Sequence, residues 1–104
     1  MRQIKNTTNH TELFAIGQKY MASGNYDVAF EAFTKAKSLG HVESITGLGI
    51  LIASGRYGKQ YPPSVGIAYL EEAVSKGDTQ ATELLSFYKQ KSINSLVGFL
   101  FAPM

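Results

Sequence analysis

The stretch from Leu13 to Gly40 constrains the fold more than any other part of the chain. Apolar residues recur there at spacings of three and four, first as far as Met21 and again after the Gly24-Asn25 pair. This spacing predicts two amphipathic helices joined by a tight turn, because residues three and four apart lie on one side of a helix. A helical hairpin cannot bury its apolar sides alone, so further helices must pack against it.

The rest of the chain contains an altered copy of this hairpin. At a constant offset, Ala29, Phe33, Ala36 and Gly40 correspond to Gly66, Leu70, Ala73 and Gly77. In the first helices, Ile16-Gly17 corresponds to Leu48-Gly49, and Leu48 in turn to Leu85. We therefore predict an all-α fold, an α-α superhelix of about two and a half helix-turn-helix repeats with a short C-terminal capping segment.

The expected organisation is a flexible lead-in over residues 1–8, a helical repeat domain over 9–92 and an apolar cap or tail over 93–104. Asn9 is expected to cap the first helix, with Glu12 reaching back in a capping box. Asp78 is expected to cap the fifth helix. That helix either stops at Asn94-Ser95 or continues to about Leu100, because apolar and small residues keep the helical period that far.

Length and composition limit the possible functions. With 104 residues, 44% of them hydrophobic, the chain forms one domain with a modest core. The net charge of +2 is scattered, which argues against nucleic-acid binding, and the absence of cysteine excludes disulfides and cysteine-bound zinc. The apolar tail is shorter than the ~20 residues that span a bilayer. The N-terminus lacks the apolar core of a secretion signal, so a cytoplasmic location is expected.

No arrangement of residues predicts catalysis. The two histidines, His10 and His41, have no further ligand at metal-binding spacing, so neither a metal nor another cofactor is expected. His41 follows Gly40 at the start of a helix and is interpreted as a surface residue near the cap. We find no nucleophile elbow and no phosphate-binding loop, and the expectation is a protein that is not an enzyme.

The first hairpin resembles the tetratricopeptide superfamily. Its matching positions are Ile16-Gly17, Tyr20, Gly24, Tyr26, Ala29, Phe33 and Ala36. The second hairpin, with Leu48-Gly49, Gly55, a longer loop, the run from Ala68 to Ala73 and Gly77, is similar to the Sel-one-like branch of that superfamily. In the third, incomplete copy Ser86 replaces the repeat glycine.

The resemblance implies that the first helix of each pair lines a concave surface that binds a protein or peptide. On that side, outside the buried stripe, the candidate partner-binding residues are Phe14, Gln18, Ile50, Phe87 and Lys91. Tyr57, in the loop from Arg56 to Tyr61, is a further candidate, because tyrosine and arginine are enriched at binding hot spots. The alternatives are that these residues belong to the core, that the terminal segment covers them, and that the tyrosines pack against their own helices.

These observations predict a protein-protein interaction module, acting as an adaptor, a chaperone-like holder or an inhibitor of the immunity type. The alternative is a self-associating structural subunit. In that case the apolar residues from Leu96 to Phe101 dock on a neighbouring chain and form a homodimer.

Overall fold

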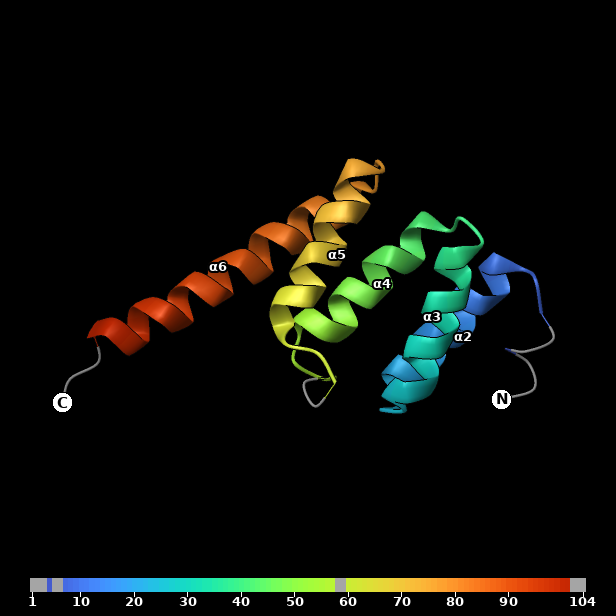
Figure 1. The fold of residues 1–104 in the computed structure, drawn as a ribbon, viewed down its shortest axis with the longest axis horizontal. Helices are drawn as coiled ribbons and strands as arrows, with labels where there is room; N and C mark the ends of the chain where they lie inside the picture. The colour runs from blue at the N-terminus through green and yellow to red at the C-terminus, as the bar shows by residue number, and fades with distance from the viewer. Residues whose placement is uncertain (1–3, 5–6, 58–59, 102–104) are drawn as a thin grey trace.

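The computed structural model describes residue 4, residues 7–57 and residues 60–101, with residues 95–101 as backbone only. Within these ranges the helices α2 (His10–Ala22), α3 (Tyr26–Ser38), α4 (Val42–Ala53), α5 (Pro63–Ser75) and α6 (Thr79–Phe101) follow one another, and no strand occurs (Figure 1). The predicted all-α class is confirmed.

Neighbours in sequence are neighbours in space. Helix α2 packs on α3 and α4 packs on α5 as hairpin-like pairs, and α3 packs on α4 to join them. Helix α6 lies against α5 and also touches α4. The molecule measures 55 × 27 × 17 Å, and Figure 1 shows the C-terminal part of α6 projecting well beyond α5.

Equivalent glycines end the second helix of each pair. Gly40 and Gly77 have φ angles of +91° and +95°, in the left-handed region that favours glycine. The following N–H groups donate to matching carbonyls, His41 N to Ala36 O at 3.1 Å and Asp78 N to Ala73 O at 3.0 Å. This hydrogen bond closes a helix end of the Schellman type. The two hairpins therefore end in the same way, as the internal alignment predicts.

A phenyl ring held between two glycines joins the first hairpin to the second. A Cβ atom on Gly17 of α2 would lie 2.5 Å from the Phe33 ring, and one on Gly47 of α4 would lie 2.8 Å from it. Phe33 itself is fully buried. The ring fills the space that a larger residue at either position would need, so α3 can contact both first helices closely.

In the second hairpin, the helices approach through glycines on both sides. A Cβ atom on Gly49 would lie 2.6 Å from Leu70, which repeats the relation between Gly17 and Phe33. A Cβ atom on Gly66 would lie 2.2 Å from the backbone nitrogen of Ala53. Ala36 and Ala73 are fully buried, as their small size at a helix-helix contact requires.

The predicted caps are partly confirmed. The Asn9 side chain accepts hydrogen bonds from the N–H groups of Thr11 at 3.0 Å and Glu12 at 3.2 Å. The reciprocal bond from Glu12 is absent, because the Asn9 N–H donates to Thr7 Oγ1 at 3.1 Å and the Glu12 carboxylate accepts from the same hydroxyl at 3.5 Å. Asp78 does cap α6, since its Oδ1 accepts from the N–H of Gln80 at 3.0 Å.

The ends of the chain add to the fold where they are described. Of the predicted flexible lead-in, residues 1–3 and 5–6 lie outside the described residues, but Ile4 is buried against Leu13, Ala32 and Ala36. At the other end, α6 continues without interruption through Asn94-Ser95 to Phe101. Gln90 Nε2 donates to Asn94 Oδ1 at 2.9 Å, which occupies the Asn94 side chain away from the backbone. Residues 102–104 of the predicted cap lie outside the described residues.

Candidate functional site

The predicted partner-binding residues fall into separate groups on the structure. Two of them, Phe87 and Lys91, line one hollow on α6, and Tyr57 lines a pocket between the two hairpins. Gln18 on α2 is exposed and Ile50 on α4 is half-buried, and neither lines these two hollows. The predicted surface is therefore divided among the first helices and the loop after α4.

Phe14 belongs largely to the interior. Its ring lies 5.9 Å from that of Phe33 and 4.9 Å from that of His41, measured between centroids. It packs against the same buried cluster as Leu48 and Leu51. Of the alternatives for this residue, the geometry matches a core position better than a binding position.

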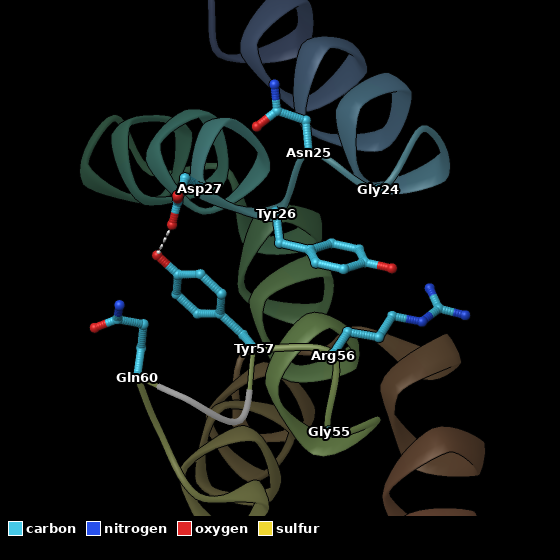
Figure 2. Close-up of a pocket in the computed structure, with 8 residues that line it drawn as sticks. All are labelled: Gly24, Asn25, Tyr26, Asp27, Gly55, Arg56, Tyr57 and Gln60. Carbon is cyan, nitrogen blue, oxygen red and sulfur yellow. Dashed lines mark hydrogen bonds between the residues drawn. The ribbon is translucent and has the colours of Figure 1, made fainter.

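The inter-hairpin pocket is built from two equivalent turns. Its lining comes from the turn between α2 and α3 and from the segment after α4: Gly24, Asn25, Tyr26, Asp27, Gly55, Arg56, Tyr57 and Gln60. The pocket is open to solvent and has a volume of about 590 Å³. Figure 2 shows Tyr57 reaching up to Asp27, while the Arg56 side chain extends the other way, below the Tyr26 ring.

Tyr57 anchors the long loop to α3. Its hydroxyl donates to Asp27 Oδ1 at 2.8 Å, and its ring stacks on Phe30 with centroids 5.1 Å apart. Tyr61 stacks on the same Phe30 ring at 5.5 Å. Burial, reinforced by the hydrogen bond to Asp27 and by its negative charge, raises the pKa of Tyr57 to about 12. The two tyrosines thus pack against a helix of the preceding hairpin, and of the two Tyr57 lines the pocket.

Arg56 supplies the positive charge of the pocket. Its side chain is exposed, and among the described residues its guanidinium forms neither an ion pair nor a hydrogen bond. The Tyr26 hydroxyl likewise forms no hydrogen bond within the described part of the chain. A guanidinium has five donors arranged in a planar fork, which suits a carboxylate. The pocket therefore presents unused donors beside an aromatic surface.

The second hollow lies on the outer side of α6 and is lined by Ser86, Phe87, Gln90, Lys91 and Asn94. Its volume is about 770 Å³. Phe87 is 58% exposed, whereas Ile93, 53% exposed, does not line the hollow. The hollow therefore presents one exposed aromatic ring among polar side chains.

The structure brings the two histidines together, which the sequence analysis missed. The His10 and His41 rings lie 4.9 Å apart, and His41 Nδ1 lies 2.8 Å from Ser44 Oγ. His41 occupies the N-cap position of α4 as expected, but its side chain is only 11% exposed, so its interpretation as a surface residue is wrong. The cue was available: His10 opens α2 and His41 precedes α4, and these first helices stack as neighbours.

Burial lowers the pKa of His41, because the charged imidazolium loses hydration there. The Glu43 carboxylate, 4.0 Å from Nε2, acts in the opposite direction and raises it, and His10 lowers it further. Across the described residues, no three histidine, aspartate or glutamate side chains are arranged to hold a metal ion. The pair is therefore a local polar contact between α2 and α4.

Comparisons with known proteins found no matching family model, no similar curated protein and no similar solved structure. None of the described helices combines the length and the apolar character needed to cross a membrane.

Proposed function

We propose that this protein is an interaction module that holds a segment of a partner protein, and that its hairpins are repeats of the tetratricopeptide-like class. The repeated contacts of Gly17 with Phe33 and of Gly49 with Leu70 support the repeat assignment. The observation that supports the binding role is the inter-hairpin pocket, where the guanidinium of Arg56, unpaired among the described residues, lies in an open hollow between two equivalent turns. In this proposal the protein binds its partner in the cytoplasm, as an adaptor, a holder or an inhibitor, and catalyses no reaction.

The chemistry of the pocket favours a segment with an acidic side chain. Arg56 can form two parallel hydrogen bonds to one carboxylate, which are stronger than bonds between neutral groups. Tyr26 offers a hydroxyl donor and an aromatic surface beside the guanidinium. Asp27 carries the opposing charge, but its carboxylate already accepts the hydrogen bond from Tyr57. We place the acidic group of the partner against Arg56 and Tyr26, on the side away from Asp27.

The first helices offer a second contact for the partner, outside the pocket. Gln18 and Ile50 occupy equivalent positions on α2 and α4, and these two helices touch each other. Gln18 is exposed and Ile50 is half-buried, so together they offer an amide and an apolar surface. Neither supplies a positive charge, and recognition of the acidic group therefore depends on Arg56.

The proposal is tested by selecting binders from a displayed random peptide library with the purified wild-type protein as bait. We expect enriched peptides to share an aspartate or glutamate. Arg56→Gln should weaken their binding by about tenfold or more in titration calorimetry, since a hydrogen-bonded charge pair contributes about 1.5–3 kcal/mol.

Lys76→Gln is the matched control, because it removes the same charge from an exposed residue that lies outside the pocket. It should leave the affinity unchanged. A selection without any enriched sequence, or peptides that bind Arg56→Gln as tightly as the wild type, would contradict the proposal.

A further inference from the structure

Within the described part of the chain, helix α6 lacks the following helix that the earlier first helices have. In α2 and α4 the repeat glycines, Gly17 and Gly49, each contact a large side chain of the following helix. Ser86 occupies the equivalent position in α6, and in place of a packed helix it lines the hollow that also contains Phe87, Gln90, Lys91 and Asn94. The side of α6 that would carry a second helix is therefore open.

We propose that the α6 helix of a second copy of this chain occupies this side, running antiparallel, with the two-fold axis passing close to Asn94. The resulting dimer goes beyond the proposed peptide binding and does not depend on it. The inter-hairpin pocket contains no residue of α6, so the two interactions use different surfaces.

The order of residues along α6 has the symmetry that such a pair requires. Phe87, Asn94 and Phe101 are spaced by seven, so they share one side of the helix by register. A two-fold axis at Asn94 places position 87 of one copy opposite position 101 of the other, with phenylalanine at both. A two-fold interface must be self-complementary in this way. Binding of an unrelated helix or of a membrane would not require a spacing that is symmetric about Asn94.

The charges select the antiparallel direction. Lys91 is the charged residue that lines the open side of α6, since Lys89 pairs with Glu71 of α5 at 3.3 Å, and no charged residue follows between Ser92 and Phe101. Antiparallel pairing places Lys91 of each helix beside the uncharged half of the other, whereas parallel pairing would bring the two Lys91 side chains together. Asn94 would meet its own copy at the centre, and a single polar residue there fixes the register of paired helices.

Sedimentation velocity over a concentration series of the full chain tests the proposal. We expect a monomer-dimer equilibrium, and Phe87→Ser should weaken it at least about tenfold, because the two-fold symmetry removes two buried aromatic anchors with one substitution. Leu39→Ser is the matched control, since Leu39 is also an exposed large apolar residue, at 41%, but lies after α3. The control should dimerise as the wild type does. Circular dichroism of both variants verifies that they remain folded.

Cysteine cross-linking tests the direction, because the chain has no cysteine of its own. Under oxidation, Asn94→Cys should form disulfide-linked dimers. A mixture of Phe87→Cys and Phe101→Cys should form mixed dimers, while Phe87→Cys alone should not cross-link. A wild-type protein that stays monomeric at all concentrations, including one that binds anionic vesicles as a monomer, would overturn the proposal. Efficient cross-linking of Phe87→Cys to itself would overturn it as well.

Discussion

At the scale of single residues, four glycines decide how closely the helices pack. Gly17 and Gly47 leave room for the Phe33 ring, Gly49 leaves room for Leu70, and Gly66 brings α5 against the backbone of α4. The first three face side chains, which can shift by changing rotamer. Gly66 faces backbone atoms, which cannot move unless the helices separate.

We therefore expect Gly66→Ala to lower the free energy of unfolding by about 2 kcal/mol or more, even though alanine favours a helix by about 1 kcal/mol. Urea denaturation measures this change. Ser64→Ala, at an exposed position of the same helix, should change the free energy by less than about 0.5 kcal/mol. A Gly66→Ala variant as stable as the wild type would show that α4 and α5 do not approach so closely.

His41 makes stability depend on pH in the acidic range. Because burial lowers its folded-state pKa below the unfolded value of about 6.5, the unfolded chain binds the proton more readily. The contribution of His41 to the free energy of unfolding is fully present above the unfolded-state pKa of about 6.5. It decreases as the pH falls below that pKa toward the lowered pKa of the folded state.

Thermal unfolding of the wild type and of His41→Asn at several pH values measures this effect. We expect the wild type to lose stability more steeply than the variant between neutral pH and about pH 5. Parallel curves for the two proteins would mean that the imidazole is not buried as described. His10→Asn should reduce the steepness less than His41→Asn does, because it removes only the neighbouring charge that helps to lower the His41 pKa.

At the scale of elements, a buried hydrogen bond connects α4 to the start of α6. Thr46 is 3% exposed, and its hydroxyl donates to Asp78 Oδ2, while Asp78 Oδ1 caps α6 through Gln80. Asp78→Ala removes the cap, which is worth about 1 kcal/mol, and leaves a buried hydroxyl without its partner, which costs about 1–3 kcal/mol. We expect a total loss of about 2–4 kcal/mol in urea denaturation.

Thr46→Val removes the hydroxyl and nearly preserves the volume, so the double variant should recover about 1 kcal/mol of the loss. Additive losses in the double-mutant cycle would indicate that Thr46 and Asp78 do not interact.

Tyr57 attaches the loop after α4 to α3, and the alkaline titration of the Tyr57 hydroxyl reports this attachment. The pKa of Tyr57, raised to about 12, lies above the ordinary value of 10.0, so the folded chain retains a proton that the unfolded chain loses. The Tyr57 hydroxyl makes its full contribution to the free energy of unfolding below pH 10, and this contribution declines as the pH rises from about 10 to 12.

Ultraviolet absorbance of phenolate in the wild type, compared with Tyr57→Phe, should identify one tyrosine that ionises near pH 12. Tyr88→Phe serves as the control, because Tyr88 lies on α6 and away from Asp27. A wild-type titration identical to that of Tyr57→Phe at high pH would contradict the contact with Asp27.

Elements near in sequence were predictable, and contacts between distant ones were less so. The helical spacing of apolar residues and the glycines at helix ends predicted the hairpins. The constant offset in the internal alignment predicted that Ala36 and Ala73 would be equally buried. The stacking of Tyr57 on Phe30 depends on how one hairpin turns against the next, which local spacing does not encode. The pairing of His10 with His41 does have a sequence signal, since both lie at the starts of first helices that stack as neighbours. Asn94-Ser95 left two alternatives, because neither residue is a strong helix breaker.

At the scale of the whole molecule, one stack of helices carries two proposed binding surfaces. The inter-hairpin pocket is proposed to hold an acidic segment of a partner, and the open side of α6 is proposed to hold a second copy of the chain. Of the six residues predicted for binding, Tyr57, Phe87 and Lys91 line these two hollows. Arg56 emerges as the central residue of the pocket through its position opposite the turn of the first hairpin.

Nuclear magnetic resonance of the isotope-labelled protein, titrated with the tightest acidic peptide from the selection, tests directly whether the inter-hairpin pocket binds the peptide. We expect amide shifts concentrated at residues 24–27 and 55–57, with the α6 amides from Ser86 to Asn94 unchanged. Shifts centred on α6, or binding without any change around Arg56, would show that the peptide does not bind in the pocket.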